Sequence, residues 1–265
     1  MAIKYLDSVK EIERLYPTGE NPVLVICSDL NAYICKYMRS SLAAFKLACE
    51  LIGSQMAIAW QLETPDVAFV KIKSSHWAGY ALQHSISAPA LGCKKIDGVV
   101  DINSSTFKDV KPSTTIFRQL LKIALFDFWI ANEDRNCNNA NLLYDVGRAR
   151  LVSIDYGCIL NTATFDYPMA QLTSNESILS SDLFQHLYEN KDKVVVEGVI
   201  SELEANYESC LNRSRRRIIQ ILEDIPKEWN VPNQIIENKL MQLFDNRWII
   251  GVWKNFVESI NDIIN

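Results

Sequence analysis

The chain has 265 residues, 48% of them hydrophobic, so it can bury a large core as one domain or as two closely packed lobes. Its formal net charge of −5 disfavours nucleic-acid binding through bulk electrostatics, and no apolar run is long enough to span a membrane. The amino-terminal segment is charged and the cysteines include no C-x-x-C pair, so we expect a cytoplasmic protein. The histidines are not at zinc-ligand spacing, so we expect no structural metal. We also expect no direct nucleic-acid or membrane partner.

The first part of the chain is predicted to be rich in strands. Residues 6–16 are predicted to form a short amphipathic helix that ends before Pro17. The segments "PVLVIC" and "AYICKYM", separated by the turn "SDLN", predict a β-hairpin. Residues 40–60 are rich in alanine and leucine and lack proline, which predicts a buried helix. The segment "TPDVAFVKIK" predicts a further strand, so the order is strand, strand, helix, strand.

The second part is predicted to be mostly helical. Residues 76–112 have weak periodicity and predict an irregular connection with small elements. Ser113 is predicted to cap a helix running through "TTIFRQLLKIALFDFWIAN", where apolar residues recur every four positions. The segment "NLLYDVGRARLVSIDYG" predicts a hairpin that turns at "DVGR". From about Ser180 the pattern is helical and is broken at Pro226 and Pro232. The fold class predicted is therefore α+β.

Lys36 and Glu50 are the first residues that could carry chemistry. Lys36 lies in the second strand of the predicted hairpin, where strand alternation could turn it to solvent or let its ammonium hold a phosphate. Glu50 lies in the middle of the buried helix, where a carboxylate is costly unless it is paired. Either Lys36 is its partner, or Glu50 lies on a narrow polar stripe with Lys46.

The segment "WIANEDRNCNNANLLYD", residues 129–145, places many short polar side chains between two core elements. Turn formation explains one or two of them, but not the whole run. Asp134 is suited to orient an attacking hydroxyl and accept its proton, and Asn139 can offer a neutral oxygen to a hard cation. We expect Arg135 to pin the loop through a carboxylate or a backbone carbonyl, and Asn132 and Asn141 to hold its backbone.

A second acidic residue ends the predicted strand in "LVSIDYG". Asp155 could be a turn residue before Gly157, or it could be the charged ligand of the same magnesium ion as Asn139. The order of these features is more informative than any one of them. A strand lysine, a helix glutamate, D-x(4)-N after a long helix and a strand ending in I-D-x-G is the order of parts in a protein-kinase-like phosphotransferase.

These segments resemble the HipA-like kinases, whose pattern runs roughly W-I-x-N-x-D-R-x-x-x-N, and in particular their short single-chain branch. The resemblance extends from about residue 16 to about residue 245 and is strongest over residues 129–157. Other segments that carry it are "YPTGENPVLVICSDLNAYICKY", "ACELIGSQMAIAWQLETPDVAFV", "LGCKKID" and "DIPKEWNV".

The resemblance implies a bilobed protein-kinase-like fold, with an N-lobe over residues 1–75 and a C-lobe over residues 76–265. It implies phosphorylation of a serine or threonine hydroxyl on a protein substrate, with ATP and Mg²⁺ as cofactors. The roles that it implies are Lys36 for the ATP phosphates, Glu50 as the partner of Lys36, Asp134 as the catalytic base, Asn139 and Asp155 as magnesium ligands, Val70 to Ile72 as the adenine hinge, and Thr18 and Gly19 as the loop over the phosphates.

The phosphate loop departs from the kinase pattern because Gly19 is its single glycine. Thr18 in the same loop is a candidate autophosphorylation site. Two alternatives remain open beside a serine/threonine protein kinase: a catalytically weak pseudokinase that acts as a binding module, and a kinase whose acceptor is a small molecule or a lipid headgroup. A small helix-turn-helix antitoxin is a further candidate partner.

Overall fold

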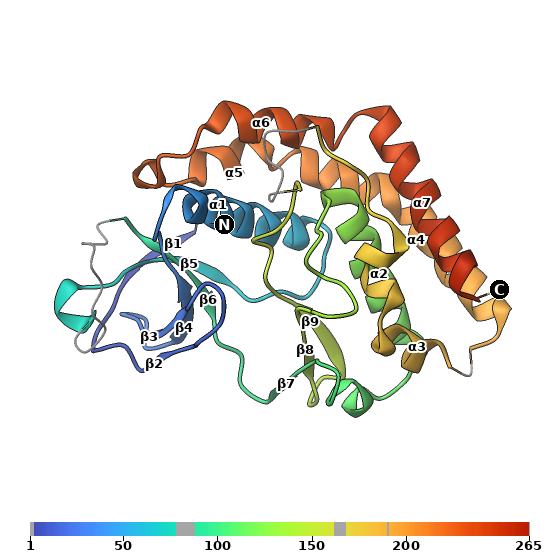
Figure 1. Cartoon of the computed structure of the whole chain (residues 1–265), viewed down its shortest axis with the longest axis horizontal. Coiled ribbons are helices and arrows are strands. Elements are labelled where there is room, and N and C mark those ends of the chain that lie inside the picture. The colour runs from blue at the N-terminus through green and yellow to red at the C-terminus, as the bar shows by residue number, and fades with distance from the viewer. Residues whose placement is uncertain (1–2, 78–87, 162–167, 190, 265) are drawn as a thin grey trace.

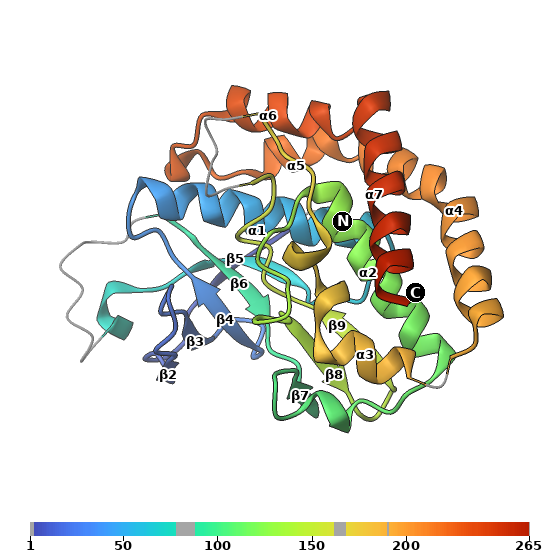
Figure 2. The ribbon, with the colours of Figure 1, turned by 45° about the vertical axis from the view of Figure 1, so that its right-hand side comes forward.

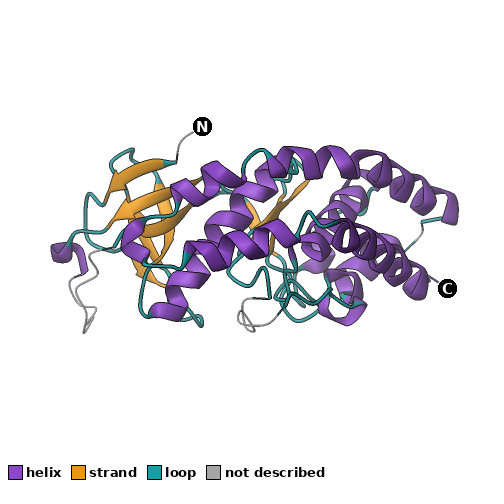
Figure 3. Ribbon diagram, turned by 90° about the horizontal axis from the view of Figure 1, so that it is seen from above, coloured by secondary structure: helices purple, strands orange, loops and turns teal. Residues whose placement is uncertain are grey.

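The computed structural model describes residues 3–77, 88–161, 168–189 and 191–264. Strands gather at one end of the molecule and helices at the other, with a smaller group of strands between them (Figure 1). The view from above shows the same division along the long axis (Figure 3). A strand-rich first part therefore meets a helix-rich second part, which confirms the predicted α+β class.

Six strands of the described chain form one sheet, in the order β1-β5-β6-β4-β3-β2. Only the β1–β5 pair among them is parallel. The strands are β1 (Lys4–Asp7), β2 (Arg14–Leu15), β3 (Val23–Ile26), β4 (Ala32–Lys36), β5 (Val67–Lys71) and β6 (Ala90–Lys94). The predicted hairpin is confirmed as β3 and β4, and the predicted strand after the helix is confirmed as β5.

The helix predicted over residues 6–16 is wrong, because this segment contains the end of β1 and all of β2 instead. Its backbone groups bond across to other strands rather than along a helix: Ser8 N donates to Lys71 O, and Glu13 N donates to Leu24 O, both at 3.0 Å. Apolar residues in the segment, such as Ile12, pack on the sheet at a spacing that also fits a helix.

The connection predicted over residues 76–112 contains two strands that the sequence analysis did not identify; residues 78–87 of it lie outside the described residues. β6 pairs with both β5 and β4, so the sheet continues past residue 75, where the sequence placed the end of the N-lobe. A Cβ at Gly92 would lie 2.9 Å from Val70 Cγ2 and 3.1 Å from the Tyr33 Cβ. Glycine therefore fits β6 between its neighbours but weakens the strand signal in the sequence.

The helix α1 (Ser41–Ala59) lies over one face of this sheet (Figure 2) and contacts the helices α4 (Lys193–Arg215) and α5 (Ile218–Asp224). Ser40 caps it by accepting a hydrogen bond from Ala43 N at 3.2 Å. A separate core cluster, which includes Val25, Cys35 and Val70, covers the other face of the sheet. Because α1 is covered on both sides, polar side chains on it must find partners inside the protein.

The second sheet has the order β7-β8-β9 and packs on the helix α2 (Thr114–Ile130), next to the point where the chain leaves β6. Its strands are β7 (Val99–Asp101), β8 (Leu142–Asp145) and β9 (Arg150–Ser153). The turn between β8 and β9 covers residues 146–149, which confirms the predicted hairpin.

The remaining helices cover the second sheet and α1 (Figure 2). They are α2 (Thr114–Ile130), α3 (Asp182–Tyr188), α4 (Lys193–Arg215), α5 (Ile218–Asp224), α6 (Asn233–Gln242) and α7 (Asn246–Ile264). Ser113 caps α2 as predicted, since its Oγ accepts from Ile116 N at 3.1 Å. Among the helices of the described residues, none is long and apolar enough to cross a membrane.

Candidate active site

Lys36 is directed to the inside of the protein by strand alternation. Tyr33 and Cys35 are buried on the face of β4 that belongs to the separate core cluster, so Lys36 points to the opposite face. Its ammonium lies 2.8 Å from Glu50 Oε2 and 2.7 Å from Asp155 Oδ1. The side chain is 14% exposed, and the pairing of Lys36 with Glu50 that the sequence predicted is present.

Glu50 is buried on α1 and is held by hydrogen bonds from two directions. Besides Lys36, the backbone N–H of Tyr156 donates to Glu50 Oε2 at 3.1 Å. Burial raises the pKa of Glu50 to about 7; Lys36 opposes this rise, but the Asp155 carboxylate adds to it. Burial alone would lower the pKa of Lys36, yet the surrounding carboxylates raise it well above its ordinary value. Lys36 therefore remains charged among an excess of carboxylates.

Asp155 follows β9 and adopts a left-handed backbone conformation, with φ of 57°. Its Oδ1 accepts hydrogen bonds from Lys36 and, at 3.3 Å, from Gly157 N. Burial would raise the pKa of Asp155, but Lys36 and the other donors lower it below its ordinary value. Asp155 is therefore an ionised carboxylate at neutral pH.

Asp134 and Asn139 lie together in the loop that follows α2. The amides of Asn139 and Asn141 both donate to Asp134 Oδ2, each at 3.0 Å. A carboxylate that is held through one oxygen can accept a proton on the other. Asn141 was expected to hold the backbone of this loop; its amide instead orients the Asp134 side chain.

Arg135 connects the Asp134 loop to α2 and to the segment after β9. It is fully buried and forms an ion pair with Asp127 of α2, while its Nη2 donates to Ile154 O at 2.8 Å. The sequence predicted that Arg135 pins the loop through a carboxylate or a carbonyl, and both contacts are present. Asn132 was expected to hold the loop backbone, but its amide donates to Asp127 Oδ1 at 2.9 Å.

Two backbone hydrogen bonds place the Asp134 loop beside the Asp155 segment. Ile154 N donates to Asn141 O at 3.1 Å, and Glu133 N donates to Cys158 O at 3.3 Å. Asn139 uses its amide nitrogen on Asp134, which leaves the amide oxygen as a neutral ligand for a hard cation.

The side chains of Asn139 and Asp155 fit a magnesium ion in chemistry, as one neutral and one ionised oxygen ligand. No cluster of three or more histidine, cysteine, aspartate or glutamate side chains that could hold a metal is found in the described parts of the chain. A magnesium ion held by these two side chains would therefore depend on further oxygens from a substrate phosphate or water.

A cavity of about 410 Å³ opens beside the Lys36–Glu50–Asp155 contacts. Its walls are largely apolar side chains and the segment 94–98, which connects β6 of the first sheet to β7 of the second. The lining residues are Pro22, Ile34, Lys36, Glu50, Pro65, Cys93, Lys94, Lys95, Ile96, Asp97, Gly98, Val99, Leu143, Ile154 and Asp155. An apolar cavity with charged groups at one side suits a ligand with an aromatic end and an anionic end.

Val70 and Ile72, expected at the hinge, do not line this cavity. Both are buried in the separate core cluster on the other face of the sheet. The connection after β6, a strand that the sequence did not predict, borders the cavity instead. The segment 94–98 contains the "KKID" of the motif "LGCKKID", so that motif was the signal from which the connection could have been located.

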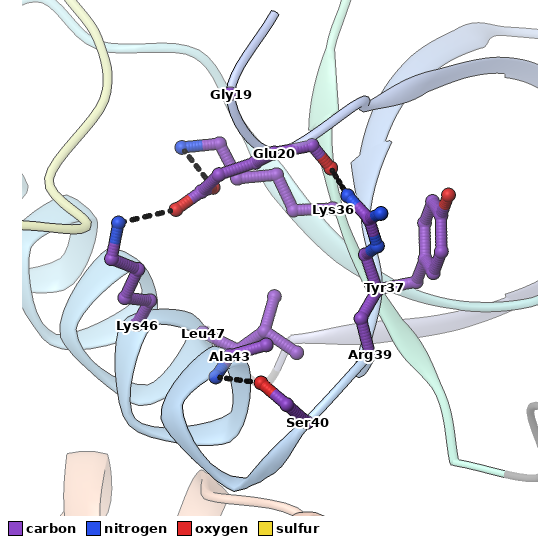
Figure 4. Close-up of a pocket in the computed structure, with 9 residues that line it drawn as sticks. All are labelled: Gly19, Glu20, Lys36, Tyr37, Arg39, Ser40, Ala43, Lys46 and Leu47. Carbon is purple, nitrogen blue, oxygen red and sulfur yellow. Dashed lines mark hydrogen bonds and ion pairs between the residues drawn. The ribbon is translucent and has the colours of Figure 1, made fainter.

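The loop with Thr18 and Gly19 borders a second cavity of about 370 Å³ on the other side of Lys36 (Figure 4). Gly19 lines this cavity, whereas Thr18 is exposed and does not. The sequence analysis did not identify Glu20, whose carboxylate lies 3.3 Å from Lys36 Nζ and 3.1 Å from Lys46 Nζ. Its only sequence signal is its position beside Gly19.

Comparison with known proteins identifies the class of protein that this fold and site define. The model of the HipA-like kinase family matches residues 9–248, so the chain belongs to this family. No curated protein matches the chain by sequence. Membership in this family supports a kinase-like phosphotransferase.

The structure can also be compared with solved structures. The chain is similar to the Helicobacter pylori proinflammatory kinase CtkA, with a TM-score of 0.57 and 12% identity over 95% of this chain and 98% of that one. It also matches the FAT and kinase domain of CtTel1 with a TM-score of 0.37 and 11% identity, over 94% of this chain and 22% of that one. The similarity to CtkA confirms the predicted kinase-like fold.

Proposed function

We propose that the protein is an ATP- and magnesium-dependent kinase that phosphorylates a serine or threonine hydroxyl of a protein substrate. The observation that carries the proposal is the position of Lys36, which contacts Glu50 and Asp155 at the edge of the apolar cavity. In this arrangement the apolar cavity can hold the aromatic base of ATP, and the Lys36 ammonium beside it can contact the phosphates. Family membership and fold support the same reaction class.

Each side chain has a separate task in the proposed reaction. Lys36 neutralises charge on the phosphates, and Glu50 holds Lys36 in place by its hydrogen bond. Bound Mg²⁺ would neutralise further charge on the transferred phosphoryl group, with Asp155 and Asn139 as its protein ligands. Asp134, oriented by two amides, positions the acceptor hydroxyl and takes up its proton.

The test is phosphate transfer from labelled ATP by the purified protein, alone and with a whole-cell lysate. We expect Asp134→Asn to lower the rate by about 10²- to 10⁴-fold, as is typical for loss of a general base. Asp262→Asn, a change at an exposed position of α7, is the matched control and should leave the rate unchanged. Transfer at the same rate in the Asp134→Asn variant would contradict the proposal.

The lysate also distinguishes the alternative acceptors. Label in protein bands supports a protein kinase, and label in small molecules alone supports the alternative acceptor. A pseudokinase would bind ATP but transfer no phosphate to either. One observation supports the pseudokinase alternative. The Glu20 carboxylate contacts Lys36, where the proposal places a phosphate of ATP.

A further inference from the structure

One carboxylate connects two lysines beside the 370 Å³ cavity. Glu20 Oε2 lies 3.3 Å from Lys36 Nζ, and Glu20 Oε1 lies 3.1 Å from Lys46 Nζ. Figure 4 shows Glu20 between the two ammonium groups, with Lys46 reaching over from α1. Lys46 lies one helical turn before Glu50, so both residues are on the same face of α1. The lysines are therefore separated by about the span of a single anionic group.

Glu20 lies on a surface loop, and its side chain can rotate away from the two lysines without disturbing the hydrophobic core. The backbone of the loop closes on itself, since Tyr16 N donates to Pro22 O and Asn21 N donates to Thr18 O, both at 2.9 Å. Nothing lies within 4 Å of a Cβ built at Gly19. The Glu20 side chain is 31% exposed, so rotating it away from the lysines costs little buried contact.

The charges around Lys36 and Lys46 are out of balance. Glu20, Glu50 and Asp155 supply three carboxylates to these two lysines. Backbone N–H groups also hold Glu50 and Asp155, and both lie closer to Lys36 than Glu20 does. Glu20 is therefore the carboxylate that can leave most easily, and a polyphosphate brings more negative charge to the same two cations.

We propose that Lys46 is a second phosphate-contacting residue of the nucleotide site, and that Glu20 occupies the place of the phosphates until nucleotide binds. This inference rests on the proposed function. Burial alone would lower the pKa of Lys46, but its hydrogen bond with Glu20 raises the pKa above its ordinary value, so Lys46 is a cation at neutral pH. Arg39, which donates to Glu20 O at 3.3 Å, holds the loop backbone near the cavity when the side chain leaves.

The inference predicts opposite effects for the two partners. In Glu20→Gln no carboxylate competes with the phosphates, so ATP should bind about 2- to 5-fold more tightly, the range of a partly exposed ion pair. In Lys46→Met one cation for the phosphates is missing, so ATP should bind about 10-fold more weakly. Adenosine has no phosphate, and neither variant should change its affinity.

The experiment is calorimetric titration of adenosine, ADP and ATP, with Mg²⁺, into the wild-type protein and the two variants. The matched control removes another lysine–glutamate pair, Lys254→Met with Glu258→Gln, whose charged atoms are 3.7 Å apart on α7. The control should bind all three ligands as the wild type does. Glu20→Gln should raise ATP affinity less in the Lys46→Met background than in the wild type. In that background Lys36 is the one cation of the pair that loss of Glu20 releases.

Several outcomes would overturn the inference. Unchanged or weaker ATP binding in Glu20→Gln would do so. ATP affinity in Lys46→Met equal to that of the wild type would also do so, because Lys46 would then not contact the phosphates of ATP. An equal loss for adenosine and ATP would show a structural role only. If the wild type binds ATP while the variants behave as it does, this inference alone fails. If the wild type binds neither ADP nor ATP, the proposed function fails with it.

Discussion

Two ion clusters lie on either side of the Ile154–Asp155 segment, and they differ in charge balance and in access to solvent. The Lys36 cluster consists of Lys36, Glu20, Glu50 and Asp155, and the Arg135 cluster consists of Arg135, Asp127 and Asn132. In the first cluster Lys36 faces several carboxylates, and the Asp155 side chain is 38% exposed. In the second, one guanidinium faces one carboxylate, with side chains 0% and 1% exposed.

These differences suit the Lys36 cluster to binding a ligand and the Arg135 cluster to stabilising the fold. Charges that are buried together without water must pair within the protein, and the Arg135 cluster does so through Asp127 and the carbonyl of Ile154. The Lys36 cluster keeps excess carboxylate and stands beside two cavities. A divalent cation can offset the excess carboxylates, and the two cavities give a ligand access to them, whereas a ligand has no access to the Arg135 cluster.

The largest expected effect on stability is from Arg135→Met, which leaves the Asp127 carboxylate buried without its cation. We expect the free energy of unfolding to fall by about 3–5 kcal/mol, measured by urea denaturation. The control is Arg148→Met, which breaks an ion pair with Asp145 whose arginine side chain is 74% exposed. That change should cost less than about 1 kcal/mol. Equal losses in the two variants would show that the Arg135 cluster has no special structural role.

A smaller loss of stability is expected from Lys36→Met, of about 1–2 kcal/mol, because Glu50 can take up a proton and Asp155 can reach solvent. The effect on function should be larger than the effect on folding: ATP affinity should fall about 10- to 100-fold, the range for loss of a hydrogen bond to a charged group. Urea denaturation and ATP titration of the same preparation check both parts. A variant as unstable as Arg135→Met, or one with unchanged ATP affinity, contradicts the comparison.

A third expected effect is a change in how stability depends on pH. The folded-state pKa of Glu50, about 7, lies above its ordinary value of 4.5, so folding favours the protonated form. The stabilisation that this gives is complete below about pH 4.5 and is lost as the pH rises through about 7. The lowered pKa of Asp155 acts in the opposite direction but below this window. Between pH 5 and pH 7.5, the stability of the wild type should therefore fall relative to that of Glu50→Gln.

Thermal unfolding of the wild type and Glu50→Gln at several pH values measures this difference. Curves that stay parallel over the whole range would show that Glu50 does not titrate there. Glu63→Gln is a suitable control, because that side chain is half exposed in its ion pair with Arg150.

The sequence was sufficient to predict the parts of the site that depend on local pattern. Lys36 and Glu50 could be paired because a buried helix does not leave a carboxylate without a partner. Asp134 and Asn139 could be paired because both lie in one polar loop after a long helix. These inferences needed only the identity of an element and the burial of one face.

The sequence was not sufficient where strands pair over long distances in the chain. β1 is a strand because it lies beside β5, more than 60 residues later, and its own residues also fit a helix. β6 was missed because Gly92 breaks its pattern, so the cavity wall formed by the segment after β6 could not be predicted. Glu20 was missed because nothing in the sequence shows that a loop carboxylate meets Lys46.

The most direct test of the central claim is the magnesium dependence of ATP binding, measured by calorimetry for the wild type and Asp155→Asn. If Asp155 holds Mg²⁺ against the phosphates, the variant should bind ATP at least about 10-fold more weakly than the wild type when Mg²⁺ is present. With Mg²⁺ removed by a chelator, the difference should disappear or reverse, because loss of the carboxylate lowers the repulsion of the phosphates. Equal affinities in the presence of Mg²⁺, or no binding by the wild type, would contradict the account.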